Sequence, residues 1–297
     1  ALKAAHIGVS LSQAEASVAA PFTSSIEDIS CILYLILEGR CALVTSFAVF
    51  KYMALYSLIQ FFSVLILYTD HSIMGDMQFL FIDLIITTVL AVTMGRQGPR
   101  DKLSAKRPMG SLVCVNNLIP LILQIVLCGA IQLGALYYLK LQPWYEPLPP
   151  GKEEVVVCWE NTVTFCVSSF QYLILALVFS KGRPYRESLI CNFWLLVSSL
   201  TLTCFITWLL VFPSKKVADF FEVLYAIHHT HEQRLFRYQL LIFPVVHLIL
   251  AIFVETCVAE SRWLKKIAHF VTWKKKPRNK YKLLLKETNF PELLQLT

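Results

Sequence analysis

The residues best suited to chemistry form a stripe of acidic and aromatic side chains along one apolar stretch, residues 77–95. Asp83 is ionisable and lies inside this stretch, while Phe79 and, at its edge, Asp76 precede it by four and seven positions. Helical residues at these spacings share a face, and Thr87 continues the stripe. Carboxylates attract ammonium groups, and an aromatic ring adds cation–π contacts of about 0.5–2 kcal/mol. The stripe therefore predicts a cation-binding face.

The preceding apolar stretch, residues 41–68, carries a second polar stripe. Tyr56 and Gln60 are four positions apart and share a helical face. If the two stretches pack as an antiparallel hairpin across the short loop 69–75, the two stripes oppose one another. The resulting slot suits an elongated organic polycation, because a compact hard ion needs about six or more oxygen ligands, which these residues alone do not provide.

A purely structural interpretation of the same residues is also possible. Tyr56 and Phe79 would then be packing aromatics, Gln60 a hydrogen bond between helices, and Asp83 the ion-pair partner of Lys51. An ionisable residue inside a membrane span is costly and indicates a pathway or site, which favours the functional interpretation for Asp83. For Phe79 and Gln60 the residues leave both interpretations open, and Lys51 is expected to be a structural or switching partner.

The composition decides what kind of element carries these stripes. The chain has 297 residues, is 56% hydrophobic and only 16% charged, and has a mean hydropathy of +0.59, which is too apolar for a soluble domain of this size. A helix of about 20 apolar residues crosses the hydrocarbon core of a bilayer. The sequence predicts a mainly α, polytopic bundle of six transmembrane helices, at about 41–68, 77–95, 112–139, 158–180, 189–212 and 239–258.

The basic residues predict how these spans are oriented. Eighteen Lys and Arg residues fall in the segments on one side, 96–107, 181–187 and 262–297, whereas six fall in the opposite segments, 69–76, 140–157 and 213–238. Because basic residues collect on the cytosolic side, both termini are expected in the cytosol. The net charge of +7 is thus a topological signal, and no nucleic acid is expected as a partner. The basic tail 259–297 is either a solvated anchor or a contact for anionic lipid.

Other chemistry-bearing residues give weaker signals. His228, His229 and His231 could ligate a metal, but they lack cysteines or a clear carboxylate partner, so a solvated loop is favoured and no metal site is predicted. His247 is expected to pack and hydrogen-bond within the last span. Glu160 and Glu255 lie near span ends, where they are expected to be hydrated.

The first residues predict a fragment of another domain. A helical segment, residues 1–6, precedes a strand-like segment, residues 7–11, and a single strand cannot satisfy its own backbone. Residues 1–23 are therefore expected to be the end of an α/β domain whose remainder is absent. Residues 24–40 are expected to form a capped stalk helix that leads into the transmembrane domain, residues 41–258.

Several motifs resemble one family, the P-type ATPases of class five, subgroup B, which are the polyamine-transporting ATPases of endosomes and lysosomes. The similar segments are ALKAAHIGVSLS at 1–12, EGRCAL at 38–43, FKYMALY at 50–56, GDMQFLFIDL at 75–84, and SFQYLILA at 169–176 with SKG at 180–182. The resemblance implies that residues 1–23 end a HAD-like phosphorylation domain. It also implies that the spans are the last six of ten core helices.

The resemblance further implies an ATP-driven translocase as the full-length protein. Tyr56, Gln60, Phe79 and Asp83 match positions that line the polyamine path of the family, with Asp76 as a weaker assignment. The cargo implied is spermine, spermidine or another cation, moved from the lumen of a late endosome, lysosome or recycling endosome to the cytosol. The family's phosphorylated aspartate and its ATP and magnesium sites have no counterpart here, so no catalytic residue is expected in this fragment.

Two rival functions belong to other classes. The chain would be a truncated, non-pumping membrane scaffold if it bound partners through its basic tail. It would be a channel or facilitator if it conducted without ATP, and an inorganic-cation transporter if a metal ion rather than a polyamine were the cargo.

Overall fold

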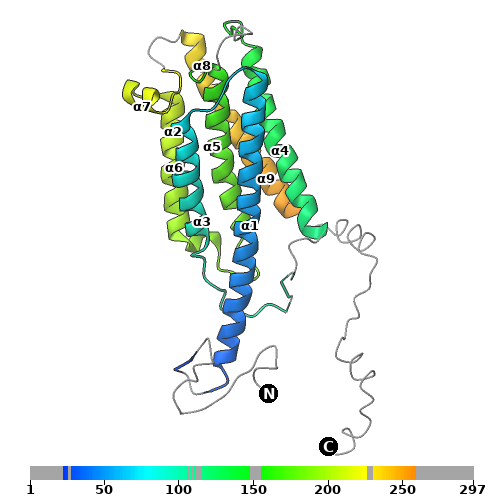
Figure 1. Ribbon diagram of the computed structural model, residues 1–297. Coiled ribbons are helices and arrows are strands. Elements are labelled where there is room, and N and C mark those ends of the chain that lie inside the picture. Colours follow the sequence, from blue (N-terminus) through cyan, green and yellow to red (C-terminus); the bar gives the residue numbers. More distant parts are fainter. Residues whose placement is uncertain are drawn as a thin grey trace, which may run out of the picture.

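The computed structural model describes residues 23–25, 28–105, 107–108, 110, 115–147, 155–225 and 230–258, and these form a bundle of long helices (Figure 1). The elements in chain order are α1 (Cys31–Thr69), α2 (Asp76–Leu80), the π-helix η1 (Phe81–Thr87), α3 (Thr88–Met94), α4 (Val115–Lys140), α5 (Trp159–Phe179), the 3-10 turn η2 (Leu189–Cys191), α6 (Phe193–Val211), α7 (Lys215–Phe220), α8 (His231–Leu240), α9 (Ile242–Phe253) and the π-helix η3 (Val254–Val258).

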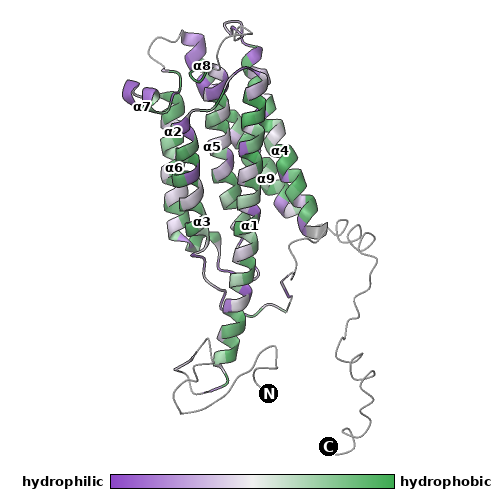
Figure 2. Cartoon of the chain, viewed as in Figure 1, coloured by the Kyte–Doolittle hydropathy of each residue, from purple (hydrophilic) through white to green (hydrophobic). Residues whose placement is uncertain are grey.

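Six of the helical segments are long and apolar enough to cross a membrane, which confirms the predicted number of spans. They are Cys31–Thr69, Asp76–Met94, Asn117–Lys140, Trp159–Phe179, Phe193–Val211 and His231–Cys257. Apolar residues dominate the bodies of these segments, while hydrophilic residues gather toward one end at α7 and α8 (Figure 2). The predicted mainly α membrane bundle is therefore present.

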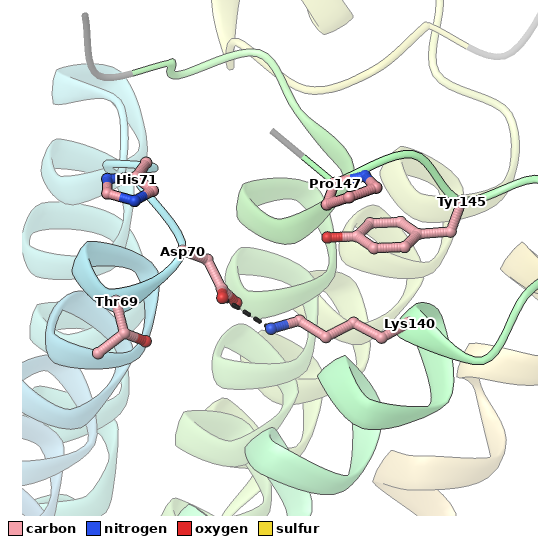
Figure 3. Close-up of a pocket in the computed structure, with 6 residues that line it drawn as sticks. All are labelled: Thr69, Asp70, His71, Lys140, Tyr145 and Pro147. Atoms are coloured by element: carbon pink, nitrogen blue, oxygen red, sulfur yellow. Dashed lines mark hydrogen bonds and ion pairs between the residues drawn. The ribbon is translucent and has the colours of Figure 1, made fainter. Parts of the chain in front are cut away.

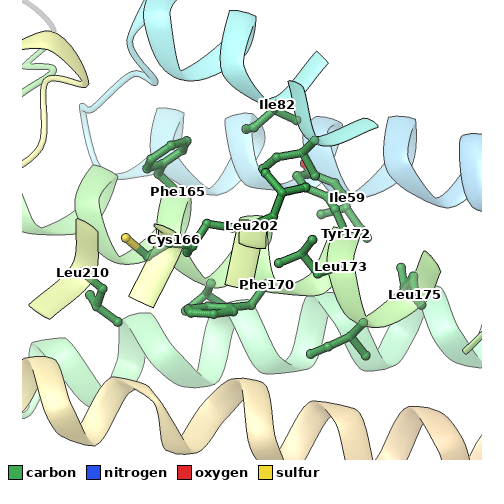
Figure 4. Packing of buried hydrophobic residues seen from close by; sticks show 14 of the residues in the cluster. Ile59, Ile82, Phe165, Cys166, Phe170, Tyr172, Leu173, Leu175, Leu202 and Leu210 are labelled. Atoms are coloured by element: carbon green, nitrogen blue, oxygen red, sulfur yellow. The ribbon is translucent and has the colours of Figure 1, made fainter. Parts of the chain in front are cut away.

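Helix α5 is the core of the bundle. In its most apolar window 94% of the residues are buried, against 17% in α1, so α5 is surrounded by protein whereas α1 is largely peripheral. It packs against α1, α4, α6 and α9. Its buried side chains interdigitate with those of the neighbouring helices, as Phe165, Phe170 and Leu173 illustrate in Figure 4. This core fixes the positions of the peripheral helices.

The first helix differs from its prediction at its start. It begins at Cys31 rather than near residue 24, and Ser30 precedes it without a side-chain capping bond. Asp28 Oδ1 instead accepts a hydrogen bond of 2.7 Å from the backbone N–H of Ser30, so the acidic side chain closes a turn before the helix. From Cys31 the helix runs through the predicted stalk into the first span without interruption.

The last span also differs from its prediction. Helix α8 begins at His231, eight residues before the predicted start, and a turn at Leu241 separates it from α9. His228 and His229, residues 1–22 of the predicted domain fragment 1–23, and the tail 259–297 lie outside the described residues. Within the described part there is no β-sheet, only two isolated bridges, Ser72 with Val155 and Pro99 with Arg186.

Candidate functional site

The hairpin of α1 and α2 brings the two predicted polar stripes together. Helix α1 ends at Thr69, and α2 begins at Asp76 after a short turn. Gln78 fixes that turn: its Oε1 accepts from the backbone N–H of Gly75 at 3.3 Å, and its Nε2 donates to the carbonyl of Phe221 at 2.7 Å. Because Gln78 is fully buried, these bonds hold the start of the second span against the loop that follows α7.

Asp83 lies at the contact between the two helices and accepts hydrogen bonds from both predicted partners on α1. The Tyr56 hydroxyl donates to Asp83 Oδ1, and Gln60 Nε2 donates to the same oxygen at 3.4 Å. Tyr56 and Gln60 are half-buried, and Asp83 is exposed. Three of the predicted residues therefore form one cluster, with a carboxylate, a phenol and an amide within hydrogen-bond reach.

The backbone around Asp83 is a π-helix, which the sequence pattern did not predict. Residues Phe81–Thr87 adopt this wider winding, and the Thr88 hydroxyl donates to the Asp83 carbonyl at 2.8 Å. Such single-turn π segments are rare and frequently occur at functional sites. The predicted stripe assumed α-helical periodicity, so its last member is misplaced: Thr87 is buried, whereas Asp83 is exposed.

The remaining predicted residues lie around this cluster without bonding to Asp83. Phe79 is half-buried against the hydrophobic core, and Asp76 is exposed in the first turn of α2. Lys51 points elsewhere, because its Nζ lies 5.9 Å from the centre of the Phe179 ring. Among the described residues, no ion pair joins Lys51 to Asp83, so this part of the structural interpretation is wrong. The packing of Phe79 against the core and the hydrogen bond of Gln60 between the two helices agree with that interpretation.

The cluster lies on the outside of the described bundle rather than in an enclosed slot. Asp83 sits near the middle of a span, yet its side chain is exposed, and so are its neighbours Leu84 and Ile85. A carboxylate facing hydrocarbon at that depth is costly. Within the described residues, α1 and η1 thus form one wall of a site and leave its other side open.

Sequence reasoning missed the contribution of α5 to this site. The Tyr172 ring lies 5.6 Å from the Tyr56 ring, centre to centre, at an interplanar angle of 59°. Tyr172 is fully buried, and so is Tyr52, one turn before Tyr56 on α1. The spacing of Tyr52 and Tyr56 was a visible signal, since residues four apart share a helical face. The contact from α5 had no such signal, because it depends on tertiary packing.

A second polar cluster is buried within the bundle and is made of neutral groups. Gln132 Nε2 donates to Ser63 Oγ and to Gln171 Oε1, both at 2.9 Å, and Gln171 Nε2 donates to the Cys128 carbonyl at 2.9 Å. His247 continues the cluster with its Nε2 at 3.5 Å from Cys128 Sγ, as expected for a packed histidine. These bonds join α1, α4, α5 and α9, which suits a structural role.

A pocket of about 190 Å³ lies near the loop that joins α1 to α2 (Figure 3). Its lining residues are Thr69, Asp70, His71, Lys140, Tyr145 and Pro147. An ion pair of 2.7 Å joins Asp70 Oδ1 to Lys140 Nζ across it. The one carboxylate in the lining is therefore already neutralised by a lysine, which makes the pocket a poorer cation site than the Asp83 cluster.

The expectation that Glu160 is hydrated is wrong. Its side chain is buried, and its Oε1 accepts a hydrogen bond of 2.5 Å from the Tyr145 hydroxyl. Trp144 and Trp159 lie beside this pair, with ring centres 4.9 Å apart. The loop after α4 therefore folds back over the start of α5 and seals it from water.

Comparison with known proteins gives one consistent group of relatives, although no protein-family model matches. The human polyamine-transporting ATPase 13A2 is 53% identical over 215 residues, which cover 72% of this chain and 18% of that protein. The human polyamine-transporting ATPase 13A3 is 40% identical over 312 residues, covering 97% and 25%. The vacuolar cation-transporting ATPase YPK9 of Saccharomyces cerevisiae is 39% identical over 289 residues, covering 97% and 18%. The chain thus spans a quarter or less of the length of these relatives.

Proposed function

Because this chain belongs to the P-type ATPases of class five, subgroup B, we propose that it is the membrane part of a pump that couples ATP hydrolysis to polyamine transport from an endolysosomal lumen to the cytosol. The observation that carries the proposal is the cluster of Tyr56, Gln60 and Asp83 at mid-span. Tyr56 and Gln60 already donate hydrogen bonds to the Asp83 carboxylate. An ammonium group of the cargo would replace these donors and pair with the carboxylate. The half-buried ring of the phenol would add a cation–π contact.

The exposed position of Asp83 supports the same proposal when the length of the relatives is considered. These proteins are at least four times as long as the matching segment. We propose that other helices of the full-length protein cover the open side of the α1 and η1 wall, so that Asp83 faces a cargo path instead of lipid. ATP and magnesium would bind in that remaining part. Conformational changes driven by ATP hydrolysis in that part would reach the cargo path through the start of α1, which begins at Cys31.

The orientation follows from the same proposal. The predicted excess of Lys and Arg on the side where α1 begins would place that end in the cytosol, with the turn between α1 and α2 in the lumen. Cargo moving from lumen to cytosol would then pass from the level of Asp76 to the level of Asp83. A late endosome, lysosome or recycling endosome is the compartment in which such a pump would act.

The test is the ATPase activity of the full-length protein, reconstituted in lipid vesicles, with spermine, spermidine or divalent metal ions added separately. Asp83→Asn is expected to reduce polyamine stimulation and uptake at least tenfold, because it removes the charge that binds the ammonium. Asp219→Asn, at an exposed position on α7, is the matched control and should change neither. Undiminished uptake in Asp83→Asn would overturn the site.

The same experiment separates the rival functions. Stimulation by metal ions without stimulation by either polyamine would indicate an inorganic-cation transporter; the yeast relative is named a cation-transporting ATPase, without mention of a polyamine. Cation flux without ATP would indicate a channel or facilitator. Absence of stimulation by every cation, with normal folding, would favour a non-pumping scaffold.

A further inference from the structure

A buried arginine holds the loop that contacts the start of the second span. Arg237 on α8 is 1% exposed, and its guanidinium donates to the carbonyls of Leu210, at 2.7 Å, and Leu224, at 2.5 Å. Its Cζ lies 5.3 Å from the centre of the Trp159 ring. Within the described residues, no carboxylate forms an ion pair with it. The positive charge is therefore directed at backbone carbonyls and an aromatic ring.

Arginine is suited to this position because its planar guanidinium presents several N–H groups in a fixed geometry. Leu210 lies near the end of α6 and Leu224 follows α7, so one side chain joins α8 to both places. Thr162 on α5 supports the same loop, since its Oγ1 accepts a hydrogen bond of 3.2 Å from the backbone N–H of Leu224. Leu224 is thus bonded to α5 through its N–H and to α8 through its carbonyl.

The other end of this loop segment, residues 221–224, contacts the helix that carries Asp83. The Phe221 carbonyl accepts from Gln78 Nε2 at 2.7 Å, and the ring centres of Phe221 and Phe81 are 5.1 Å apart. Gln78 belongs to α2, and Phe81 is the first residue of η1. Helices α2, α7 and α8 lie at the same end of the bundle (Figure 1). The segment 221–224 therefore links Arg237 to the helix of Asp83.

The contacts of Gln78 and Phe81 fix the direction in which Asp83 points. These two residues are three positions apart and share a helical face, which is buried. Asp83 is exposed, so it lies on a different face of the same helix. The helix cannot rotate about its axis without breaking the bond from Gln78 to the segment 221–224. The buried face therefore keeps Asp83 directed toward Tyr56 on α1.

We propose that Arg237 is a positioning residue for the cargo site. Through the segment 221–224 and Gln78, it sets the rotation of the helix that carries Asp83. This inference rests on the proposed function and adds to it a residue that does not touch the cargo. Rotation matters because a charge-assisted hydrogen bond between an ammonium group and a carboxylate requires a short distance and good alignment. A rotated Asp83 would still attract the cargo, but it would bind the cargo more weakly.

The experiment measures spermine-stimulated ATPase activity of the full-length protein in Arg237→Met, Gln78→Met and the variant that carries both changes. Each single change is expected to raise the spermine concentration for half-maximal stimulation about fivefold, with the maximal rate within about twofold of the wild type. The double variant is expected to match the single variants, because both changes interrupt the same series of contacts. Arg237→Lys keeps the charge without the planar fork and should have an intermediate effect.

Two controls separate positioning from stability, with all variants compared at equal amounts of folded protein. Tyr145→Phe removes the hydrogen bond to buried Glu160, so it should lower the unfolding temperature and leave the spermine dependence unchanged. Lys216→Met removes a positive charge at an exposed position on α7, and it should change neither quantity.

The outcomes separate this inference from the function on which it rests. If spermine does not stimulate the wild type, the proposed function fails, and a positioning role defined by that cargo fails with it. If spermine stimulates the wild type and Asp83→Asn abolishes the effect, an unchanged half-maximal concentration in Arg237→Met and Gln78→Met overturns this inference alone. Arg237 would then only stabilise the fold.

The double variant tests the series of contacts itself. An increase equal to the product of the two single increases would mean that Arg237 and Gln78 act independently, which overturns the link through the segment 221–224. Should Arg237→Met fail to fold, Arg237→Lys and its combination with Gln78→Met give the same comparison. An unchanged spermine dependence in Arg237→Lys, together with a fivefold increase in Gln78→Met, would then limit the positioning role to Gln78 and overturn the assignment of Arg237.

Discussion

Two tyrosine–carboxylate pairs occur among the described residues, and they differ in the burial of the carboxylate. The Tyr56 hydroxyl donates to Asp83 between α1 and η1, and the Tyr145 hydroxyl donates to Glu160 at the start of α5. Glu160 is 2% exposed, and the rings of Trp144 and Trp159, the residues that precede Tyr145 and Glu160 in the chain, pack with their centres 4.9 Å apart. Asp83 is exposed, and so are the apolar residues Leu84 and Ile85 that follow it.

The contrast separates a structural carboxylate from one available to a ligand. Glu160 is enclosed by side chains of the same chain, so its hydrogen bond to Tyr145 substitutes for water and stabilises the fold. Asp83 has a hydrogen-bonded side against α1 and an open side, so another group can still approach it. A tyrosine–carboxylate pair therefore stabilises the fold at Glu160, where the carboxylate is buried. At Asp83, where the carboxylate is exposed, the same pairing leaves it available to a ligand.

The largest expected effect comes from making the same substitution in both pairs. Tyr145→Phe leaves the buried Glu160 carboxylate without its donor and should lower the free energy of unfolding by about 2 kcal/mol, within the range for hydrogen bonds to buried charged groups. Tyr56→Phe should lower it by about 0.5 kcal/mol or less, because exposed Asp83 can find other partners. Thermal unfolding of both variants in the same detergent measures the difference.

The reverse order of stabilities would break the comparison. A larger loss in Tyr56→Phe than in Tyr145→Phe would mean that the Asp83 cluster holds the bundle together. Leu133→Ala, a change at an exposed apolar position on α4, controls for the general sensitivity of the helices to substitution and should have a small effect.

The second expected effect concerns cargo binding. It distinguishes the contribution of the Tyr56 ring from the contribution of its hydroxyl. Tyr56→Leu should raise the half-maximal spermine concentration of the full-length pump about fivefold, the equivalent of about 1 kcal/mol of cation–π contact. Tyr56→Phe keeps the ring and should change it less than threefold. Tyr145→Leu, compared at equal amounts of folded protein, should leave the value unchanged. An equal effect of the leucine variants at both positions would argue against a special role for the Asp83 cluster.

Parts of this site were predictable from the sequence, for reasons specific to each residue. Tyr56, Gln60 and Asp83 were predicted to meet, because helical spacing defines a face and a short turn defines an antiparallel hairpin. The π-helix was not predictable, since no residue in Phe81–Thr87 marks a change of winding, and Thr87 was misplaced as a result. The alternative in which Lys51 pairs with Asp83 is contradicted by a tertiary contact, because Lys51 Nζ lies 5.9 Å from the centre of the Phe179 ring, which is distant in sequence.

The fold, like the site, was predictable where it depends on local sequence and was not predictable where it depends on tertiary packing. The six spans were predictable from apolar length alone. The central position of α5 was not, because it depends on how the other helices pack around it. Glu160 was expected in water because it lies near the end of a span, and its burial depends on the loop that carries Tyr145, which the sequence pattern does not place.

A third effect is a pH dependence at the Tyr145–Glu160 pair. Burial, with a further contribution from the hydrogen bond to Glu160, raises the pKa of Tyr145 above its usual value near 10. Below about pH 10 the phenol is protonated in both states and its contribution to stability is complete. Above that pH the unfolded phenol loses its proton first, so stability falls as pH rises. Tyr145→Phe should flatten this alkaline decline in thermal unfolding scans. An equally steep decline in the variant would remove Tyr145 from the explanation.

The smallest expected effect is the absence of an energetic coupling between Lys51 and Asp83. It tests whether Asp83 has an ion-pair partner. Lys51→Met, Asp83→Asn and the double variant form a double-mutant cycle, read out as free energies of unfolding. With Lys51 Nζ held over the Phe179 ring, the two changes should add to within about 0.5 kcal/mol. A coupling of about 1 kcal/mol or more would show that the two charges pair in solution. The Asp83 pair would then resemble the Glu160 pair, a carboxylate committed to the fold, and its open side would no longer imply a ligand.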